Sequence, residues 1–181
     1  MAALQLAVAV GARVIATTSS DEKGARLKTL GATHVINYQT HPETRGEDAR
    51  TLTPGGRSAD FVIDVGGTET LPVSLAAVRV DVIVLVTGQV GESTVDAVSM
   101  FAALLHTCIA RGILASSRNQ FRELVRFIDD HKVVPVVDDV MFEMAEARSA
   151  YMRLKEKKHF AKVLIKVDWL NLNRAVSIRV P

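Results

Sequence analysis

Short apolar runs alternate with polar, helix-forming segments along most of the chain. Residues 14–16 form one run without a polar interruption, and residues 61–65 and 82–87 form two more. Strands of a parallel sheet that helices cover on both faces have this composition. The pattern therefore predicts an α/β protein built on a doubly wound parallel sheet.

The remaining elements follow from the same alternation and from cap signals. We expect strands at 13–17, 34–37, 61–65, 82–87, 108–114 and 162–167, and helices at 21–30, 44–52, 68–78, 96–106, 119–131 and 142–155. Thr68 is the expected cap of the helix at 68–78, and Ser117 or Asn119 that of the helix at 119–131. Pro135 interrupts the extended stretch 133–137 and marks it as an edge or irregular strand.

The junction between the first strand and the helix after it carries the most informative chemistry. It reads Thr-Thr-Ser-Ser at 17–20, and Ser19 with Glu22 three residues later predicts a capping box. In a doubly wound nucleotide-binding fold, a carboxylate at this point suits a free 2′-hydroxyl, whereas hydroxyls and a cation suit a 2′-phosphate. Thr18, Ser19 and Lys23 therefore favour NADP(H) over NAD. The alternative is a capped helix after a core strand, with no ligand.

Composition narrows the classes of partner. The 181 residues carry 22 basic and 20 acidic side chains, a net charge of +2, and 5% are aromatic, so nothing favours a nucleic-acid partner. No apolar stretch is long enough to cross a bilayer, and no basic residue precedes Arg13, unlike a signal peptide. We expect a cytoplasmic protein with no membrane partner.

No catalytic or metal-binding constellation is evident. Cys108 is the single cysteine, which excludes an intramolecular disulfide and a multi-cysteine zinc site. His34 and His41 lack metal-ligand spacing, and Ser116 and Ser117 have no recognisable His/Asp arrangement. We nominate no catalytic residue and no metal ligand, and expect no zinc.

Five segments occur in an order that resembles a known family. They are GARVIATTSSDEK at 11–23, LGATHVINY at 30–38, DFVIDVGG at 60–67, RGILASSRNQF at 111–121 and KHFAKVLIKV at 158–167. Together they resemble the medium-chain dehydrogenase/reductases, in the zinc-type alcohol dehydrogenase-like and quinone oxidoreductase-like branch. The resemblance implies NADP(H)-dependent hydride transfer to or from a small carbonyl, alcohol or enone substrate. It also implies that Tyr38 lies near the 2′-phosphate and that Gly66 and Gly88 lie beside the nicotinamide ribose.

The resemblance further implies a domain organisation. Residues 1–132 correspond to an incomplete Rossmann-like NADP-binding domain that opens in its first helix, at 1–10, and lacks the first strand and the glycine-rich turn. Residues 133–167 correspond to the return segment of a GroES-like catalytic domain that this sequence does not contain, and residues 168–181 are unassigned. The missing strands predict open sheet edges, to be covered by a second copy or a complementing subunit. A non-catalytic truncated homologue acting as an interaction or regulatory subunit, and a partial gene product, are the alternatives.

Two departures from the family pattern bear on the site. Residues 79–82, Arg-Val-Asp-Val, replace the usual turn of arginine, proline and paired glycines, which puts the register of the following strand in doubt. Ala161 stands where the family commonly has glycine, and its methyl group would narrow the nicotinamide end of the site.

Overall fold

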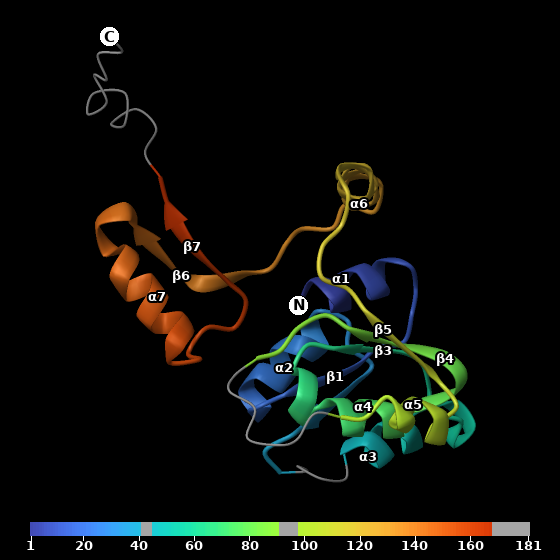
Figure 1. Cartoon of the computed structure of the whole chain (residues 1–181). Coiled ribbons are helices and arrows are strands. Elements are labelled where there is room, and N and C mark those ends of the chain that lie inside the picture. Colours follow the sequence, from blue (N-terminus) through green and yellow to red (C-terminus); the bar gives the residue numbers. More distant parts are fainter. Residues whose placement is uncertain (41–44, 91–97, 168–181) are drawn as a thin grey trace. The chain divides into compact units, whose positions relative to one another are not determined.

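The computed structural model describes residues 1–40, 45–90 and 98–167 (Figure 1). The chain divides into two compact units, and each is described by itself. The larger unit spans Ala3–Val133, and the smaller one comprises Met1–Ala2 and the chain from Val134 onward. All strand pairs among the described residues are parallel. The predicted α/β class with parallel strands is confirmed.

The strands of the larger unit form two sheets. β1 pairs with β2 in one, and the other has the order β3-β4-β5, so β1 and β3 each have a single neighbour among the described strands. The strands are β1 (Ile15–Thr18), β2 (His34–Asn37), β3 (Ala59–Asp64), β4 (Val78–Val86) and β5 (Ile109–Gly112), and the helices are α1 (Ala2–Ala9), α2 (Asp21–Thr29), α3 (Arg45–Thr51), α4 (Leu71–Ala77), α5 (Phe101–Leu105) and α6 (Arg118–Asp130).

Helix α2 begins at Asp21 as predicted, but its cap is one residue later than the sequence suggested. Its N-cap is Ser20, whose extended backbone (φ −153°) brings the side-chain oxygen to accept the Lys23 N–H at 3.3 Å. The prediction of Ser19 as the cap was therefore wrong. The two adjacent serines fit the cap signal equally well in sequence, but the helix begins at Asp21, which places Ser20 at the N-cap and Lys23 at the third helical position, whose N–H a cap side chain accepts. Ser19 is consequently not used as a cap.

The entrance to β4 is irregular, as the unusual residues at 79–82 suggested. Ala59 pairs with Val78, yet Phe61 pairs with Ile83, so β4 carries extra residues over a bulge. Asp81 lies in this bulge with φ 60°, and its N–H donates to the Thr107 carbonyl at 2.8 Å. β4 therefore begins at Val78, four residues before the predicted strand.

The helix before β4 also begins later than predicted. A 3₁₀ turn occupies Gly67–Glu69, and α4 follows with Thr70 at its N-cap position. The prediction that Thr68 caps this helix was wrong, because Thr68 lies within the 3₁₀ turn and its hydroxyl donates to Gln89 at 3.0 Å. Part of the predicted helix at 96–106 lies outside the described residues, and α5 covers Phe101–Leu105 of the remainder.

The centre of the hydrophobic core is formed by Leu75 of α4 with Val78 and Val84 of β4, and Val84 is fully buried. Burial of each such side chain contributes about 1.5–3 kcal/mol to stability. Cys108, Val62 of β3, and Val82 and Val86 of β4 pack around this centre. The core therefore fixes the β3–β4 pair, which carries part of the site described below.

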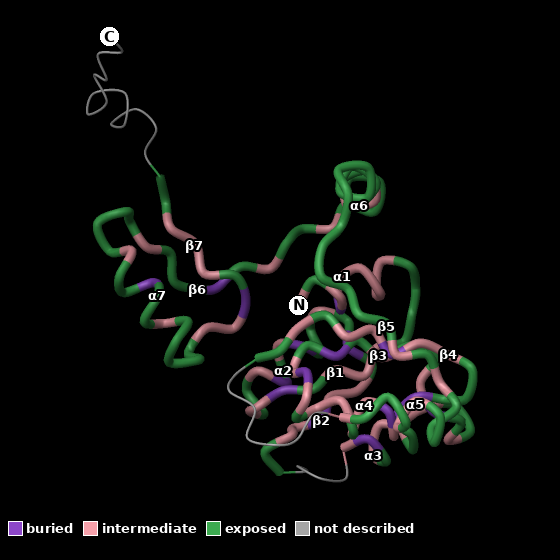
Figure 2. The backbone as a smooth tube through the Cα atoms, in the orientation of Figure 1, coloured by how far each residue is buried: buried purple, intermediate pink, exposed green. Residues whose placement is uncertain are grey.

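Helix α6 has the predicted amphipathic pattern and the predicted cap. Ser117 accepts the Gln120 N–H and Gln120 accepts the Ser117 N–H, so the capping box is complete. Phe121, Leu124 and Val125 nevertheless remain exposed, and α6 is almost entirely exposed in Figure 2. Its apolar stripe contributes little to the core of this unit.

The smaller unit contains β6 (Val137–Glu143), α7 (Ala147–Lys155) and β7 (Lys162–Lys166), with β6 parallel to β7. The predicted helix at 142–155 began too early, because Phe142 belongs to β6 and pairs with Ile165. A 3₁₀ turn, Met144–Glu146, separates the strand from the helix. The tail at 168–181 lies outside the described residues.

The helices of the described ranges are short. None of them has both the length and the apolar character that a membrane span requires.

Candidate functional site

The carboxyl ends of β1 and β2 meet at the predicted adenosine site. Thr18 ends β1 and pairs in register with Asn37, the last residue of β2. The Tyr38 N–H then donates to the Thr18 carbonyl at 2.9 Å. Thr18 is buried and Ser19 half-buried, so both hydroxyl-bearing residues lie at one edge of the sheet beside Tyr38. This edge is where open α/β sheets bind ligands.

Two cations flank this edge. Lys23 lies in the first turn of α2 and is half-buried. Arg45 begins α3, and its guanidinium lies over the Tyr38 ring, 5.8 Å from the ring centroid. Stacking on an aromatic face holds a guanidinium in place while leaving its N–H groups available to an anion. Arg45 was not nominated from the sequence, because its proximity to Tyr38 depends on how the loop between them folds.

The acidic residue nearest the strand end is already engaged. Asp21, the first residue of α2, accepts a hydrogen bond from the Asn37 side-chain amide at 2.8 Å. Asn37 also accepts the Gln39 N–H at 3.0 Å, which closes the turn after β2. A carboxylate in the first turn of a helix is stabilised by the helix dipole without any ligand. Asp21 therefore has a structural role linking α2 to β2.

The turns after β3 and β4 form a second polar group. Asp64 ends β3, is 3% exposed, and accepts from the Gly67 N–H at 2.8 Å and from the hydroxyls of Thr70 and Ser74 at 2.9 and 2.6 Å. Thr87 at the end of β4 donates its N–H to the Asp64 carbonyl at 2.8 Å. The Asp64 carboxylate thus holds the turn after β3, and the Asp64 carbonyl binds the turn after β4. We call this set of hydrogen bonds the Asp64 clasp.

The glycines of these two turns are required by packing within the protein. A Cβ at Gly88 would lie 2.9 Å from the Val65 carbonyl oxygen, and one at Gly66 would collide with the Thr70 side chain. Gly67 has φ 79°, and a Cβ there would lie 2.8 Å from the Gly88 carbonyl oxygen. These contacts account for the glycines without a ligand. Their placement beside the nicotinamide ribose stays a prediction from the family resemblance.

The six predicted residues thus fall into two groups. Thr18, Ser19, Lys23 and Tyr38 gather at the ends of β1 and β2, and Gly66 and Gly88 belong to the clasped turns after β3 and β4. The sequence missed Arg45 and the clasp at Asp64. A buried aspartate at a strand end, followed by Gly-Gly and then Thr and Ser at helical spacing, is a signal that could have indicated the clasp.

The described residues contain little that could act as a nucleophile or a metal ligand. Burial raises the pKa of the Cys108 thiol, which disfavours the reactive thiolate. Across the described ranges, no three His, Cys, Asp or Glu side chains gather as a metal site requires. The features described above suit the binding of an anionic nucleotide.

Comparisons with known proteins agree with this fold. Residues 1–130 match the family model described as zinc-binding dehydrogenase. A zinc-type alcohol dehydrogenase-like protein of Schizosaccharomyces pombe is 38% identical over 169 residues, which cover 92% of this chain and 48% of that protein. A probable quinone oxidoreductase of Leishmania amazonensis is 28% identical, with 87% of this chain and 50% of that protein covered.

Comparison with solved structures agrees with the sequence comparisons. A crystal structure titled as an NAD-dependent alcohol dehydrogenase superposes with a TM-score of 0.80 at 30% identity, covering 92% of this chain and 47% of that one. The chain spans about half the length of the curated relatives that it matches. Its Rossmann-like α/β fold is therefore that of the alcohol dehydrogenases, and the chain belongs to the zinc-binding dehydrogenase family of medium-chain dehydrogenases/reductases.

Proposed function

We propose that this chain carries the adenosine half of an NADP(H) site in an oxidoreductase that transfers hydride to or from a small carbonyl, alcohol or enone. Family membership supports the oxidoreductase class. The preference for NADP(H) rests on one observation: hydroxyl-bearing residues and two cations surround the ends of β1 and β2, while the neighbouring Asp21 is engaged by Asn37. When bound, the cofactor supplies the redox chemistry.

The residues of this chain bind and orient the nucleotide. Lys23 and Arg45 would balance the charge of a 2′-phosphate, and the hydroxyl of Ser19 would donate to one of its oxygens. The Tyr38 ring holds Arg45 in place through the stacking contact. The relative titled NAD-dependent uses the other nicotinamide cofactor, so the preference needs a direct comparison of the two in this chain.

NADPH affinity is expected to depend on both cations. Lys23→Ala and Arg45→Ala should each weaken NADPH binding about tenfold while leaving NADH binding unchanged, because each removes one charge-assisted contact to the 2′-phosphate. Isothermal titration of the full chain with each cofactor measures this. Lys28→Ala, an exposed cation at the other end of α2, is the matched control. Equal affinity for NADPH and NADH, or an equal loss in the control, would contradict the proposed preference.

The second candidate is an interaction subunit, and the strand topology favours it. β1 and β3 each have one open edge, and the standard doubly wound order places a further strand between the positions that they would occupy. On β3, Phe61 and Ile63 are 66% and 46% exposed. An extended apolar segment from a second copy or a complementing subunit would pair with the open edge of β3, and its side chains would pack beside Phe61 and Ile63 on the same face of the sheet.

Self-association is expected to increase with protein concentration in sedimentation velocity. Ile63→Lys should reduce it, since a lysine on an open edge strand opposes further pairing. Phe121→Lys on the exposed face of α6 is the control for general hydrophobic association. A monomer at all concentrations, or a larger effect from the α6 variant, would contradict association through β3.

A further inference from the structure

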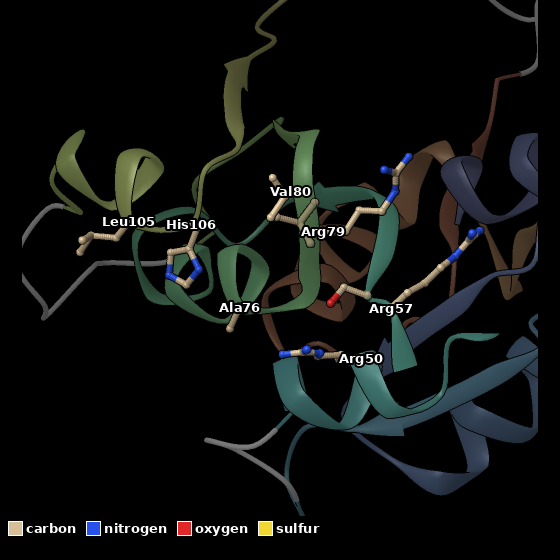
Figure 3. Close-up of a pocket in the computed structure, with 9 residues that line it drawn as sticks. Arg50, Arg57, Ala76, Arg79, Val80, Leu105 and His106 are labelled. Atoms are coloured by element: carbon tan, nitrogen blue, oxygen red, sulfur yellow. The ribbon is translucent and has the colours of Figure 1, made fainter. Parts of the chain in front are cut away.

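A basic pocket lies at the amino ends of β3 and β4. It is an open pocket with a volume of about 480 Å³. Figure 3 shows the side chains that line it. Its polar lining consists of Arg50, Arg57, Ser58, Arg79 and His106, which come from α3, the turn before β3, the start of β4 and the end of α5. None of the residues that line it is acidic. The pocket therefore presents cations without a carboxylate in its wall.

The nearest compensating charge is Asp60, just outside the lining. Its carboxylate lies 2.6 Å from Arg79 and 3.6 Å from Arg57, so one negative charge is shared between two guanidinium groups. Arg50, Arg57 and Arg79 together with Asp60 carry a net charge of +2. Arg50 donates its Nε–H to the Gly56 carbonyl at 3.2 Å and has no carboxylate partner among the described residues. A guanidinium has five N–H donors, so most of those on Arg50 remain for a ligand.

The helix ends near the pocket do not cancel this charge. α3, α4 and α5 have seven, seven and five residues, and each ends close to the pocket. A helix C-terminus contributes at most about half a negative charge, and short helices contribute less. This effect favours basic residues in the last turn of a helix, as at Arg50 of α3. The pocket remains positive after it is included.

Ser58 adds a hydroxyl to the basic lining of the pocket. The residue is 8% exposed, and it lines the pocket. Its backbone has φ 76°, and its N–H donates to the Thr53 hydroxyl at 3.0 Å, which fixes the serine in place. Its own hydroxyl has no hydrogen-bond partner among the described residues. The hydroxyl is not fully buried, so it is open to the pocket and available to a ligand there.

We propose that this basic pocket binds a phosphate group, with Arg50, Ser58 and His106 as donors to its oxygens. A phosphate supplies acceptors for a guanidinium fork and a hydroxyl together. The pocket is separate from the proposed cofactor site, because it lies at the amino ends of parallel strands whose carboxyl ends carry Gly66 and Gly88. The six residues of β3 place the two ends roughly 15–20 Å apart.

The test is a titration of the full chain with inorganic pyrophosphate, followed by NMR at the His106 ring and the Ser58 amide. Both signals should shift with a Kd of about 1 mM or tighter. Arg50→Ala should weaken binding about tenfold and Ser58→Ala about threefold, as expected for a charge-assisted and a neutral hydrogen bond. Arg122→Ala, an exposed arginine of α6, should leave the affinity unchanged.

Two further titrations identify the kind of phosphate that binds and distinguish this pocket from the proposed cofactor site. Glycerol 3-phosphate that binds as pyrophosphate does would assign the pocket to phosphate esters, and binding of pyrophosphate alone would assign it to the inorganic anion. Lys23→Ala should retain pocket binding even where NADPH binding is weakened. Unshifted His106 and Ser58 signals, or an equal loss of affinity in Arg122→Ala, would overturn the proposal.

Discussion

Replacement of Asp64 by alanine is expected to lower the free energy of unfolding of the larger unit by about 3 kcal/mol, because one buried and two partly buried donors lose their acceptor. The Gly67 N–H and the hydroxyls of Thr70 and Ser74 all donate to this carboxylate, which is 3% exposed. Urea unfolding followed at the Val84 amide, in the centre of the core, measures the loss. Asp64→Asn keeps the shape of the side chain and one carbonyl acceptor, so a smaller loss of about 2 kcal/mol in the free energy of unfolding is expected.

Asp60→Asn on the same strand is the matched control. Asp60 is half exposed, and within the part of the chain that the structure describes it takes part only in surface ion pairs with Arg57 and Arg79. Such pairs contribute about 1 kcal/mol or less. Comparable losses at Asp60 and Asp64 would show that the clasp of the β3 and β4 turns does not depend on the buried carboxylate.

The type and order of the elements could be predicted from the sequence, because apolar runs and cap residues are local signals. β1, β2, α2 and α6 lie close to their predicted ranges. One error arose where two neighbouring residues fit the same sequence signal equally well. Ser19 and Ser20 both suit an N-cap, and only the three-dimensional path of the chain makes Ser20 the acceptor of the Lys23 N–H.

Tertiary contacts decided the other errors. Phe142 reads as the start of a helix, yet its pairing with Ile165 extends β6 to Glu143. The division of the larger unit into two sheets was also outside local sequence signals, since strand order depends on contacts between distant segments. For the same reason the sequence indicated Lys23 and Tyr38 but missed Arg45, whose position over the Tyr38 ring is set by the path after β2.

The predicted division at 132–133, the cofactor site and the partners stay predictions. The structure contains no ligand or second chain against which the cofactor site or the partners could be compared, and the division at 132–133 rests on the family resemblance. Gly66 and Gly88 illustrate the difficulty, because close packing of two turns and close approach of a ligand both require the absence of a Cβ.

Asp138 links elements of the smaller unit, as Asp64 links the turns of the larger one. Its side chain is 1% exposed, pairs with Arg153 of α7, and accepts the Phe160 N–H at 3.0 Å. One carboxylate on β6 therefore ties α7 and the approach to β7 to the strand. Asp138→Ala is expected to destabilise this unit by about 3 kcal/mol, since it leaves a partly buried guanidinium and an N–H unpaired.

Acidification should reproduce part of this loss. The hydrogen bond from Arg153 and the backbone N–H groups lower the pKa of Asp138 from 3.8 to about 2. Because the folded pKa is below the unfolded one, the stabilisation is complete above the unfolded pKa and is lost as the pH falls through about 2. A shift of this size corresponds to about 2 kcal/mol of stability.

Amide hydrogen exchange of β6 and β7 in the full chain measures both effects. After correction for the intrinsic exchange rate at each pH, wild-type protection should fall by about 2 kcal/mol between roughly pH 5 and pH 2, whereas Asp138→Asn should start lower and fall less. Glu143→Gln, which removes an exposed pair with Lys166, should behave as the wild type. An acid-induced loss that persists unchanged in Asp138→Asn would mean that another carboxylate controls the stability of this unit.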